Sequence, residues 1–202
     1  MCIPAAGGQE GKQYVVQANL MDKPTVWPAM ARAYEAAQGD LADRLLAALD
    51  AAEAEGGDIR GRQSAAILIV PAKSTGRPWA DKLFDLRVED HPTPLVELRR
   101  LVGVQRAYNH MGAGDECVAI KDWACAEREY GGALTLQPDN AEMAFWYAVA
   151  LATNAQLEKA RPLFASAFKA DPRWRELIKR LPGVDQLPKD PKLLEAIAGI
   201  GR

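Results

Sequence analysis

The chain has 202 residues, of which 49% are hydrophobic, and its formal net charge at pH 7 is −2. This length allows one or two domains with a buried core. The near-neutral charge provides neither a basic surface for nucleic acid nor a polybasic patch for a membrane. No apolar run approaches the roughly 18 residues that span a bilayer.

The amino-terminal segment and the cysteines indicate a cellular compartment. The Gly-rich segment Met1–Lys12 lacks the basic-then-apolar order of a signal peptide. The three cysteines, Cys2, Cys117 and Cys125, show neither zinc spacing nor a Cys-x-x-Cys motif. We therefore expect reduced thiols, a cytoplasmic location, no metal and no cofactor.

The first predicted elements are a strand and two helices. Tyr14–Met21 alternates in polarity and is rich in β-forming residues, which predicts a strand. Thr25–Gln38 and Leu41–Glu55 have apolar residues at helical spacing. Asp40 is placed to cap the second helix, and Gly56 follows its end.

Two further strands and a long helix are predicted next. Ser64–Val70 is a continuous apolar run, which predicts a strand buried on both faces. Pro71–Pro78 is a loop, and Lys82–Val88 alternates as the partner strand. Pro92 and Pro94 then start a long helical region, with Asp90 as its expected cap. About three strands result, fewer than a stable sheet usually has.

Polar side chains gather at the start of the first of these two strands. They are Asp58, Arg60, Arg62, Gln63 and Ser64. Arginine binds carboxylates through two parallel hydrogen bonds, and an amide or hydroxyl could lie beside a reacting carbonyl, so this cluster could form a pocket wall. The alternative is a helix-to-strand loop held by ion pairs.

A second polar cluster accompanies the partner strand. Asp85 and Arg87 share one strand face by alternation. His91 could act as a base, or His91-Pro92 could be a structural turn. We expect Arg60, Gln63, Asp85 and Arg87 to converge in one substrate-binding cleft.

These segments resemble a known family. Gly-Asp-x-Arg-Gly-Arg-Gln-Ser-Ala-Ala from Gly57, Asp-Leu-Arg-Val-x-Asp-His-Pro from Asp85 and the strand from Tyr14 are similar to an Ntn-hydrolase-like family, domain of unknown function 1028. The resemblance covers roughly residues 2–106. It implies the second half of an α/β/β/α sandwich, without the first half.

The resemblance also implies an amide-bond hydrolase. Ntn enzymes use an N-terminal nucleophile whose own amine is the base. In this family the expected nucleophile is a Thr in the half that is absent here, so the chain alone should be inactive. Asn19, on the first predicted strand, could help to hold an oxyanion. Cys2 could become an N-terminal thiol after removal of Met1, although its surroundings are loop-like.

The carboxyl-terminal half contains an internal repeat. Ala126, Tyr130, Ala133 and Pro138 recur 34 residues later as Ala160, Phe164, Ala167 and Pro172. A helical period of 34 residues is typical of tetratricopeptide repeats. Ala126 and Ala160 should therefore be buried at helix crossings. The first repeat departs from the pattern, since its first helix carries Gly112 and Gly114.

Further helices should follow the repeats, one beginning near Asp171 and a short last one over Asp190–Ile200. Three tryptophans lie at helical positions here, either in the core or along a peptide groove. They are Trp123, Trp146 and Trp174.

The predicted fold class is thus α+β. Residues 1–103 form a partial Ntn-hydrolase-like α/β/β/α sandwich, and residues 104–202 form an all-α tetratricopeptide-like module. Two functions remain open: an amide-bond hydrolase domain without its nucleophile half, carrying an interaction module, and a non-enzymatic interaction or scaffold protein. The expected partners are a peptide or protein ligand of the repeats and a second copy bound through the α/β domain.

Overall fold

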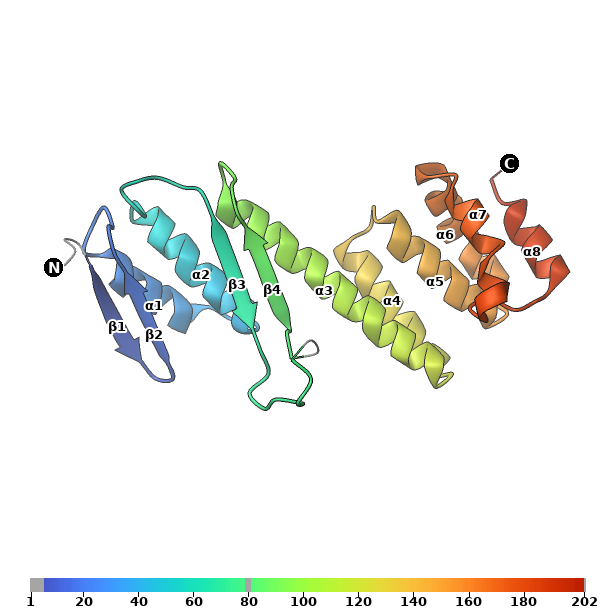
Figure 1. The fold of residues 1–202 in the computed structure, drawn as a ribbon, viewed down its shortest axis with the longest axis horizontal. Helices are drawn as coiled ribbons and strands as arrows, with labels where there is room; N and C mark the ends of the chain where they lie inside the picture. The colour runs from blue at the N-terminus through green and yellow to red at the C-terminus, as the bar shows by residue number, and fades with distance from the viewer. Residues whose placement is uncertain (1–5, 79–80, 202) are drawn as a thin grey trace. The chain divides into compact units, whose positions relative to one another are not determined.

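The chain is mixed α+β and mostly helical (Figure 1). We analysed a computed structural model, which describes residues 6–78 and 81–201. The chain divides into two compact units, Met1–Val102 and Gly103–Arg202. Each unit is described by itself below.

The strands of the N-terminal unit form two antiparallel hairpins. β1 (Gly7–Gly11) pairs with β2 (Tyr14–Ala18), and β3 (Ala65–Ile69) pairs with β4 (Phe84–Val88). β1 was not predicted, because its sequence is rich in glycine, which is depleted in strands. The described residues therefore contain four named strands rather than the expected three or so.

Two helices pack beside these hairpins. α1 (Val26–Ala36) and α2 (Leu41–Ala54) lie close to their predicted bounds. Asp40 caps α2, since its side chain accepts a hydrogen bond from the backbone N–H of Asp43, and the Asp43 side chain returns a bond to the Asp40 N–H. This reciprocal pair satisfies two donors that a helix start otherwise leaves unbonded.

One hydrophobic core joins α2, the second hairpin and the start of α3 (Pro94–Ala119). Its centre is formed by Leu46, Leu98 and Val102, which are almost inaccessible to solvent. α3 begins at Pro94, so Thr93 and not Asp90 precedes its first turn. The predicted capping role of Asp90 is wrong, because the chain makes a turn between Asp90 and the helix.

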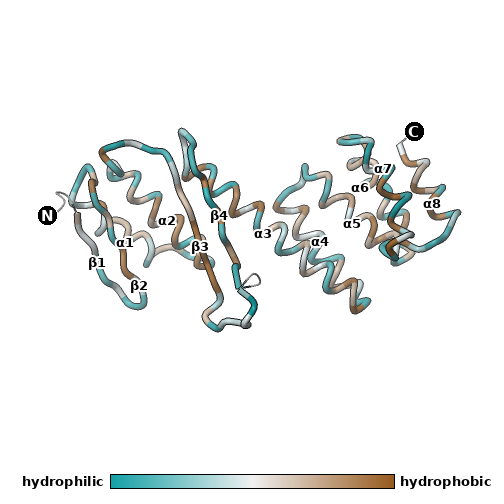
Figure 2. Tube along the Cα trace, in the orientation of Figure 1, coloured by the Kyte–Doolittle hydropathy of each residue, from teal (hydrophilic) through white to brown (hydrophobic). Residues whose placement is uncertain are grey.

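Only one face of β3 is buried. Ile67 and Ile69 face the core, whereas Leu68 is 56% exposed and the following Val70 is 55% exposed. β3 is hydrophobic along its length (Figure 2), which made a doubly buried strand the natural expectation. That prediction is wrong, because helices of this unit pack on one side of the hairpin and the other side has no cover among the described residues.

The C-terminal unit is built from helices. The later part of α3 is followed by α4 (Trp123–Leu136), α5 (Ala141–Thr153) and α6 (Leu157–Ala170). Ala126 is 2% exposed and Ala160 is fully buried, as the repeat spacing predicted. The aromatic side chains at the equivalent repeat positions, Tyr130 and Phe164, are buried beside them.

Short helices complete this unit: α7 (Trp174–Ile178), the 3₁₀ helix η1 (Leu181–Val184) and α8 (Pro191–Ala198). They cover one core cluster with α5 and α6. The Trp174 ring stacks on Phe145 with 4.6 Å between ring centroids. No helix in residues 6–78 or 81–201 is both long and apolar enough to cross a membrane.

Candidate functional site

The first candidate site is a polar cavity of about 630 Å³ in the N-terminal unit. All five residues of the first predicted cluster line it. The chain reaches this cavity through Gly57, whose φ of +65° places it in the left-handed region that glycine favours. An isolated bridge between Met21 and Asp58 then fixes the start of the polar loop. The lining includes Asp58, Arg60, Arg62, Gln63 and Ser64.

Both arginines at this cavity already have carboxylate partners. Arg60 forms an ion pair with Asp58 at 2.6 Å, and Arg62 pairs with Glu53. The hydrogen bonds from Arg60 lower the pKa of Asp58 to about 2. A carboxylate ligand would therefore have to compete with these internal carboxylates for either guanidinium.

The second predicted cluster does not join this cavity. Among the described residues that line it, neither Asp85 nor Arg87 occurs. Asp85 accepts from Lys82 at 2.6 Å and from Arg87 at 3.1 Å, on the outer face of β4. The expected convergence with Arg60 and Gln63 is thus not observed, because Asp85 and Arg87 lie opposite Leu68 and Ala66 on the exposed side of the hairpin.

His91 takes part in a turn. Its backbone N–H donates to the carbonyl of Gln63 at 2.9 Å, and its ring Nδ1 accepts from the backbone N–H of Thr93 at 3.0 Å. The ring nitrogen that could act as a base is therefore occupied by a local bond.

The two proposed catalytic residues lie apart from this cavity or outside the described residues. β2 ends at Ala18, so Asn19 follows the strand instead of lying within it. Asn19 and Gln17 line a separate depression with Gly7 and Gly8. Cys2 lies outside the residues that the structure describes.

The second candidate site is a cavity of about 630 Å³ in the helical unit. α3, α4, α5 and the segment after η1 contribute to its wall. Its lining combines aromatic rings with carboxylates: Tyr108, Tyr130, Trp146, Asp115, Glu142 and Asp185. Within the described residues that line this cavity there is no lysine or arginine.

Two tyrosine–carboxylate hydrogen bonds organise this lining. The Tyr108 hydroxyl donates to Glu142 at 2.7 Å, and the Tyr130 hydroxyl donates to Asp115 at 2.6 Å. The pKa of Tyr130 is raised, first by burial and then by Asp115. The bond to Glu142 raises the pKa of Tyr108. Both tyrosines therefore stay protonated and keep donating at neutral pH.

Sequence reasoning missed most of this second site, although the repeat contains the signal. Tyr108 and Glu142 are separated by the same 34 residues as the buried alanines, and so are Gly112 and Trp146. Equivalent positions of successive repeats thus contribute to one wall. A search along the first helix of each repeat would have identified them.

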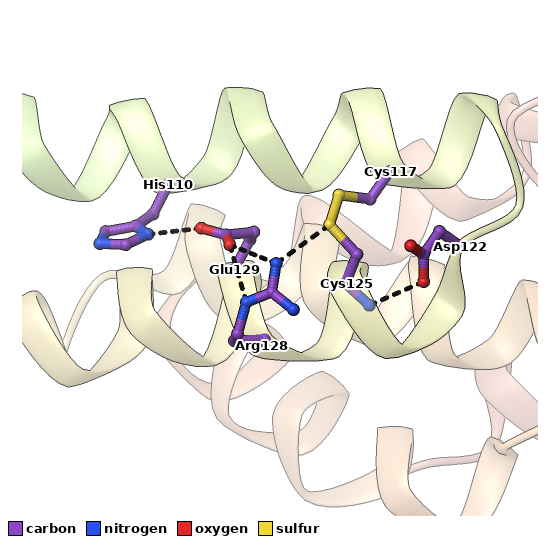
Figure 3. The surroundings of a disulfide bond; sticks show 6 residues. All are labelled: His110, Cys117, Asp122, Cys125, Arg128 and Glu129. Carbon is purple, nitrogen blue, oxygen red and sulfur yellow. Dashed lines mark hydrogen bonds and ion pairs between the residues drawn. A yellow bond between two sulfur atoms is a disulfide. The ribbon is translucent and has the colours of Figure 1, made fainter.

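The cysteines of the helical unit correct another prediction. Cys117 on α3 and Cys125 on α4 form a disulfide with 5.7 Å between their Cα atoms (Figure 3). Reduced thiols were expected because the chain has an odd number of cysteines and no recognisable signal peptide. The packing of two consecutive helices brings the two cysteines together, which removes the basis for the predicted reducing compartment.

Comparisons with known proteins concern the N-terminal unit. No curated protein and no solved structure matches the chain. Residues 1–98 match a family model described as a family of unknown function (DUF1028). This range ends within the start of α3 and contains the whole polar cavity. Residues 1–98 of this chain therefore carry the pattern of that family of unknown function.

Proposed function

We propose that this chain is a binding protein whose helical unit holds a basic segment of a partner protein. The helical unit acts as a tetratricopeptide-like module, and the N-terminal unit has no catalytic activity of its own. The observation that carries this proposal is the lining of the helical cavity, which joins aromatic rings and carboxylates without a lysine or arginine among its described residues.

The charge of the lining favours a cationic ligand. Asp185 is neutralised by Lys189 at 3.0 Å. Asp115 and Glu142 each accept a hydrogen bond from a tyrosine hydroxyl, and a neutral donor does not offset the charge of a carboxylate. A lysine or arginine side chain of a partner would complement them, and the partly buried Trp146 ring would add a cation–π contribution.

A polar atom in the wall supports the same site. The Thr153 Oγ1 atom is buried, and it has no hydrogen-bond partner within the described part of the chain. Thr153 also lines the cavity. A backbone or side-chain group of a bound segment would satisfy this hydroxyl, because unbonded buried polar groups cost free energy.

A randomised peptide library panned on the full-length chain tests the proposal. We expect enrichment of peptides with Lys or Arg beside apolar residues, and loss of that enrichment in Glu142→Gln and Asp115→Asn. Glu158→Gln is the matched control, since Glu158 is an exposed carboxylate on α6 paired with Arg161. Equal enrichment of acidic peptides, or binding that is unchanged in both cavity variants, would reject the function.

A second candidate function, half of an Ntn-type amide hydrolase, is favoured by the uncovered face of β3. Leu68 and Val70 are exposed where the sandwich implied by the family resemblance would add a second sheet. In that case the face would pair with a missing half or with a second copy. The solution mass of the chain and its turnover of small amides test this: we expect no turnover, and Cys2-dependent amidase activity in a stable monomer would contradict it.

A further inference from the structure

The geometry points to a redox-active site in the helical unit that is independent of its cavity ligand. We propose that Cys117 and Cys125 are a reversible thiol–disulfide pair, in which Cys125 exchanges with a low-molecular-weight disulfide and Cys117 resolves the mixed disulfide. Glutathione disulfide is the chemical class of oxidant that this step requires.

The two sulfurs differ in accessibility. Cys117 is 7% exposed and belongs to a buried cluster of the helical unit. Cys125 is only partly buried and packs at the edge of that cluster. A soluble disulfide therefore reaches Cys125 first, while Cys117 is sheltered from direct attack.

The surroundings of Cys125 favour its thiolate. It lies in the first turn of α4, where the helix dipole stabilises negative charge. The Arg128 Nη2 atom is 3.3 Å from the Cys125 sulfur. A positive charge at this distance stabilises the thiolate, which is the nucleophilic form of cysteine.

A chain of polar contacts holds Arg128 at the sulfur (Figure 3). Glu129 accepts from the Arg128 Nε atom at 3.0 Å, and His110 Nδ1 lies 2.8 Å from the other oxygen of Glu129. Glu129 offsets part of the charge of Arg128, so the main effect of Glu129 is to orient the Arg128 side chain toward the Cys125 sulfur. Asp122 accepts from the backbone N–H of Cys125 at 3.0 Å and caps the helix.

The proposed reaction balances as two exchanges. The Cys125 thiolate attacks one sulfur of glutathione disulfide, forms a mixed disulfide and releases one glutathione thiolate. The Cys117 thiolate then attacks the Cys125 sulfur, forms the intramolecular disulfide and releases the second glutathione. Two protein thiols are oxidised, one glutathione disulfide is reduced, and the two thiol protons pass to the glutathione thiolates.

The pair adjoins the cavity wall. Val118 and Ala119, directly after Cys117, line the cavity, and so does Tyr130, which follows Cys125 on α4. Closing the disulfide joins α3 to α4 beside this wall. Oxidation would therefore restrict the relative motion of two helices that form the cavity.

The test uses the full-length chain with Cys2→Ser, which removes the third thiol. Each variant is reduced, freed of reductant and exposed to glutathione disulfide, and its mass is followed after acid quenching. We expect Cys117→Ser to accumulate one glutathione adduct, Cys125→Ser to react at least about tenfold more slowly, and the chain with both cysteines to close to the disulfide.

Arginine variants test the role of the neighbouring charge. Arg128→Gln should slow disulfide closure severalfold, whereas Arg161→Gln, an exposed ion-paired arginine on α6, should not. Equal adduct rates in the two cysteine variants, or a chain that stays reduced in excess glutathione disulfide, would overturn the proposal. If Cys117→Ser loses helix content by circular dichroism, the Arg128→Gln comparison decides, since it keeps both cysteines.

Discussion

The two cavities of this chain have similar volumes, but their charged side chains have different kinds of partner. In the N-terminal cavity each arginine is bonded to a carboxylate from the same unit. In the helical cavity, Asp115 and Glu142 are bonded to neutral tyrosine hydroxyls. Ion pairs formed within the unit cancel the charge that a ligand could use, whereas a neutral donor orients a carboxylate and leaves its charge in place. A cluster of charged residues is therefore a weaker sign of a site than an uncompensated charge.

The largest expected effect is the loss of stability on reduction of the disulfide, which should occur in the helical unit and not in the N-terminal unit. Reducing the disulfide should destabilise the helical unit by about 2–3 kcal/mol, the value for a short closed loop. The N-terminal unit should not respond, since its described residues contain no cysteine. Hydrogen exchange measured peptide by peptide, with and without reductant, checks this. Increased exchange in α1 and α2 would contradict the separation.

The next effect concerns how closely α3 and α4 pack beside the helical cavity. A Cβ atom added at Gly114 would lie 2.7 Å from the Tyr130 ring. Gly114→Ala should therefore cost about 1–3 kcal/mol of unfolding free energy through overpacking.

Gly131→Ala is the matched control for that change, because Gly131 lies within α4 and its added Cβ atom would meet nothing within 4 Å. It should stabilise the helix by about 0.5–1 kcal/mol. Urea unfolding followed by circular dichroism measures both variants. Similar midpoints for the two would exclude close packing at Gly114.

A smaller loss of stability is expected when the Tyr130 hydroxyl, which donates to Asp115 in the helical cavity, is removed. Tyr130→Phe removes the hydrogen bond to Asp115 and should cost about 1–2 kcal/mol at pH 8. The Tyr130 pKa is raised in the folded state, so its contribution is complete below the ordinary value of 10.0 and is lost as pH rises above it. Wild-type stability should therefore fall above pH 10, and the fall should be smaller in Tyr130→Phe. Unfolding free energies measured from about pH 8 to 11 would show whether the two curves converge.

The smallest effect is expected at the N-terminal cavity. Arg60→Ala should lower the melting temperature at neutral pH by less than the changes above, because the ion pair with Asp58 is largely exposed and screened by solvent. Its signature is the pKa of Asp58, which should rise from about 2 toward its ordinary value of 3.8. The lowered pKa contributes stability above about pH 4 and loses it as pH falls toward 2. NMR titration of the Asp58 carboxyl measures the shift, and an unchanged pKa would mean that Arg60 is not its main partner.

The sequence predicted helices better than it predicted which residues meet. Apolar spacing located α1 and α2 to within about two residues at each end. The 34-residue period correctly predicted that Ala126 and Ala160 are buried. The helix bounds depend on residues within one or two helical turns of each other, and the buried alanines recur at a fixed spacing in the sequence, so both can be found without knowing how the elements pack.

Contacts between elements were harder to predict. An apolar strand can be buried on one face or on both, so hydrophobicity alone could not predict the exposure of Leu68. The pairing of Cys117 with Cys125 depends on how α3 lies against α4. The separation of Asp85 from Arg60 likewise depends on which side of the hairpin is covered. The Tyr108–Glu142 pair spans one 34-residue period, so finding it required the period to be applied to polar residues as well as to alanines. The Tyr130–Asp115 pair does not follow that period and depends on how α3 packs against α4.

The 34-residue spacing between Tyr108 and Glu142 also means that the cavity wall is assembled from equivalent positions of two repeats. Each repeat contributes the same four first-helix positions to the cavity wall: 108, 112, 115 and 119 in one repeat, and 142, 146, 149 and 153 in the next. In repeat proteins each module contacts chiefly its neighbours. Inserting one more copy of a 34-residue module would therefore lengthen the wall by one set of these positions. If the wall holds a partner segment as we propose, the length of that segment would grow in equal steps.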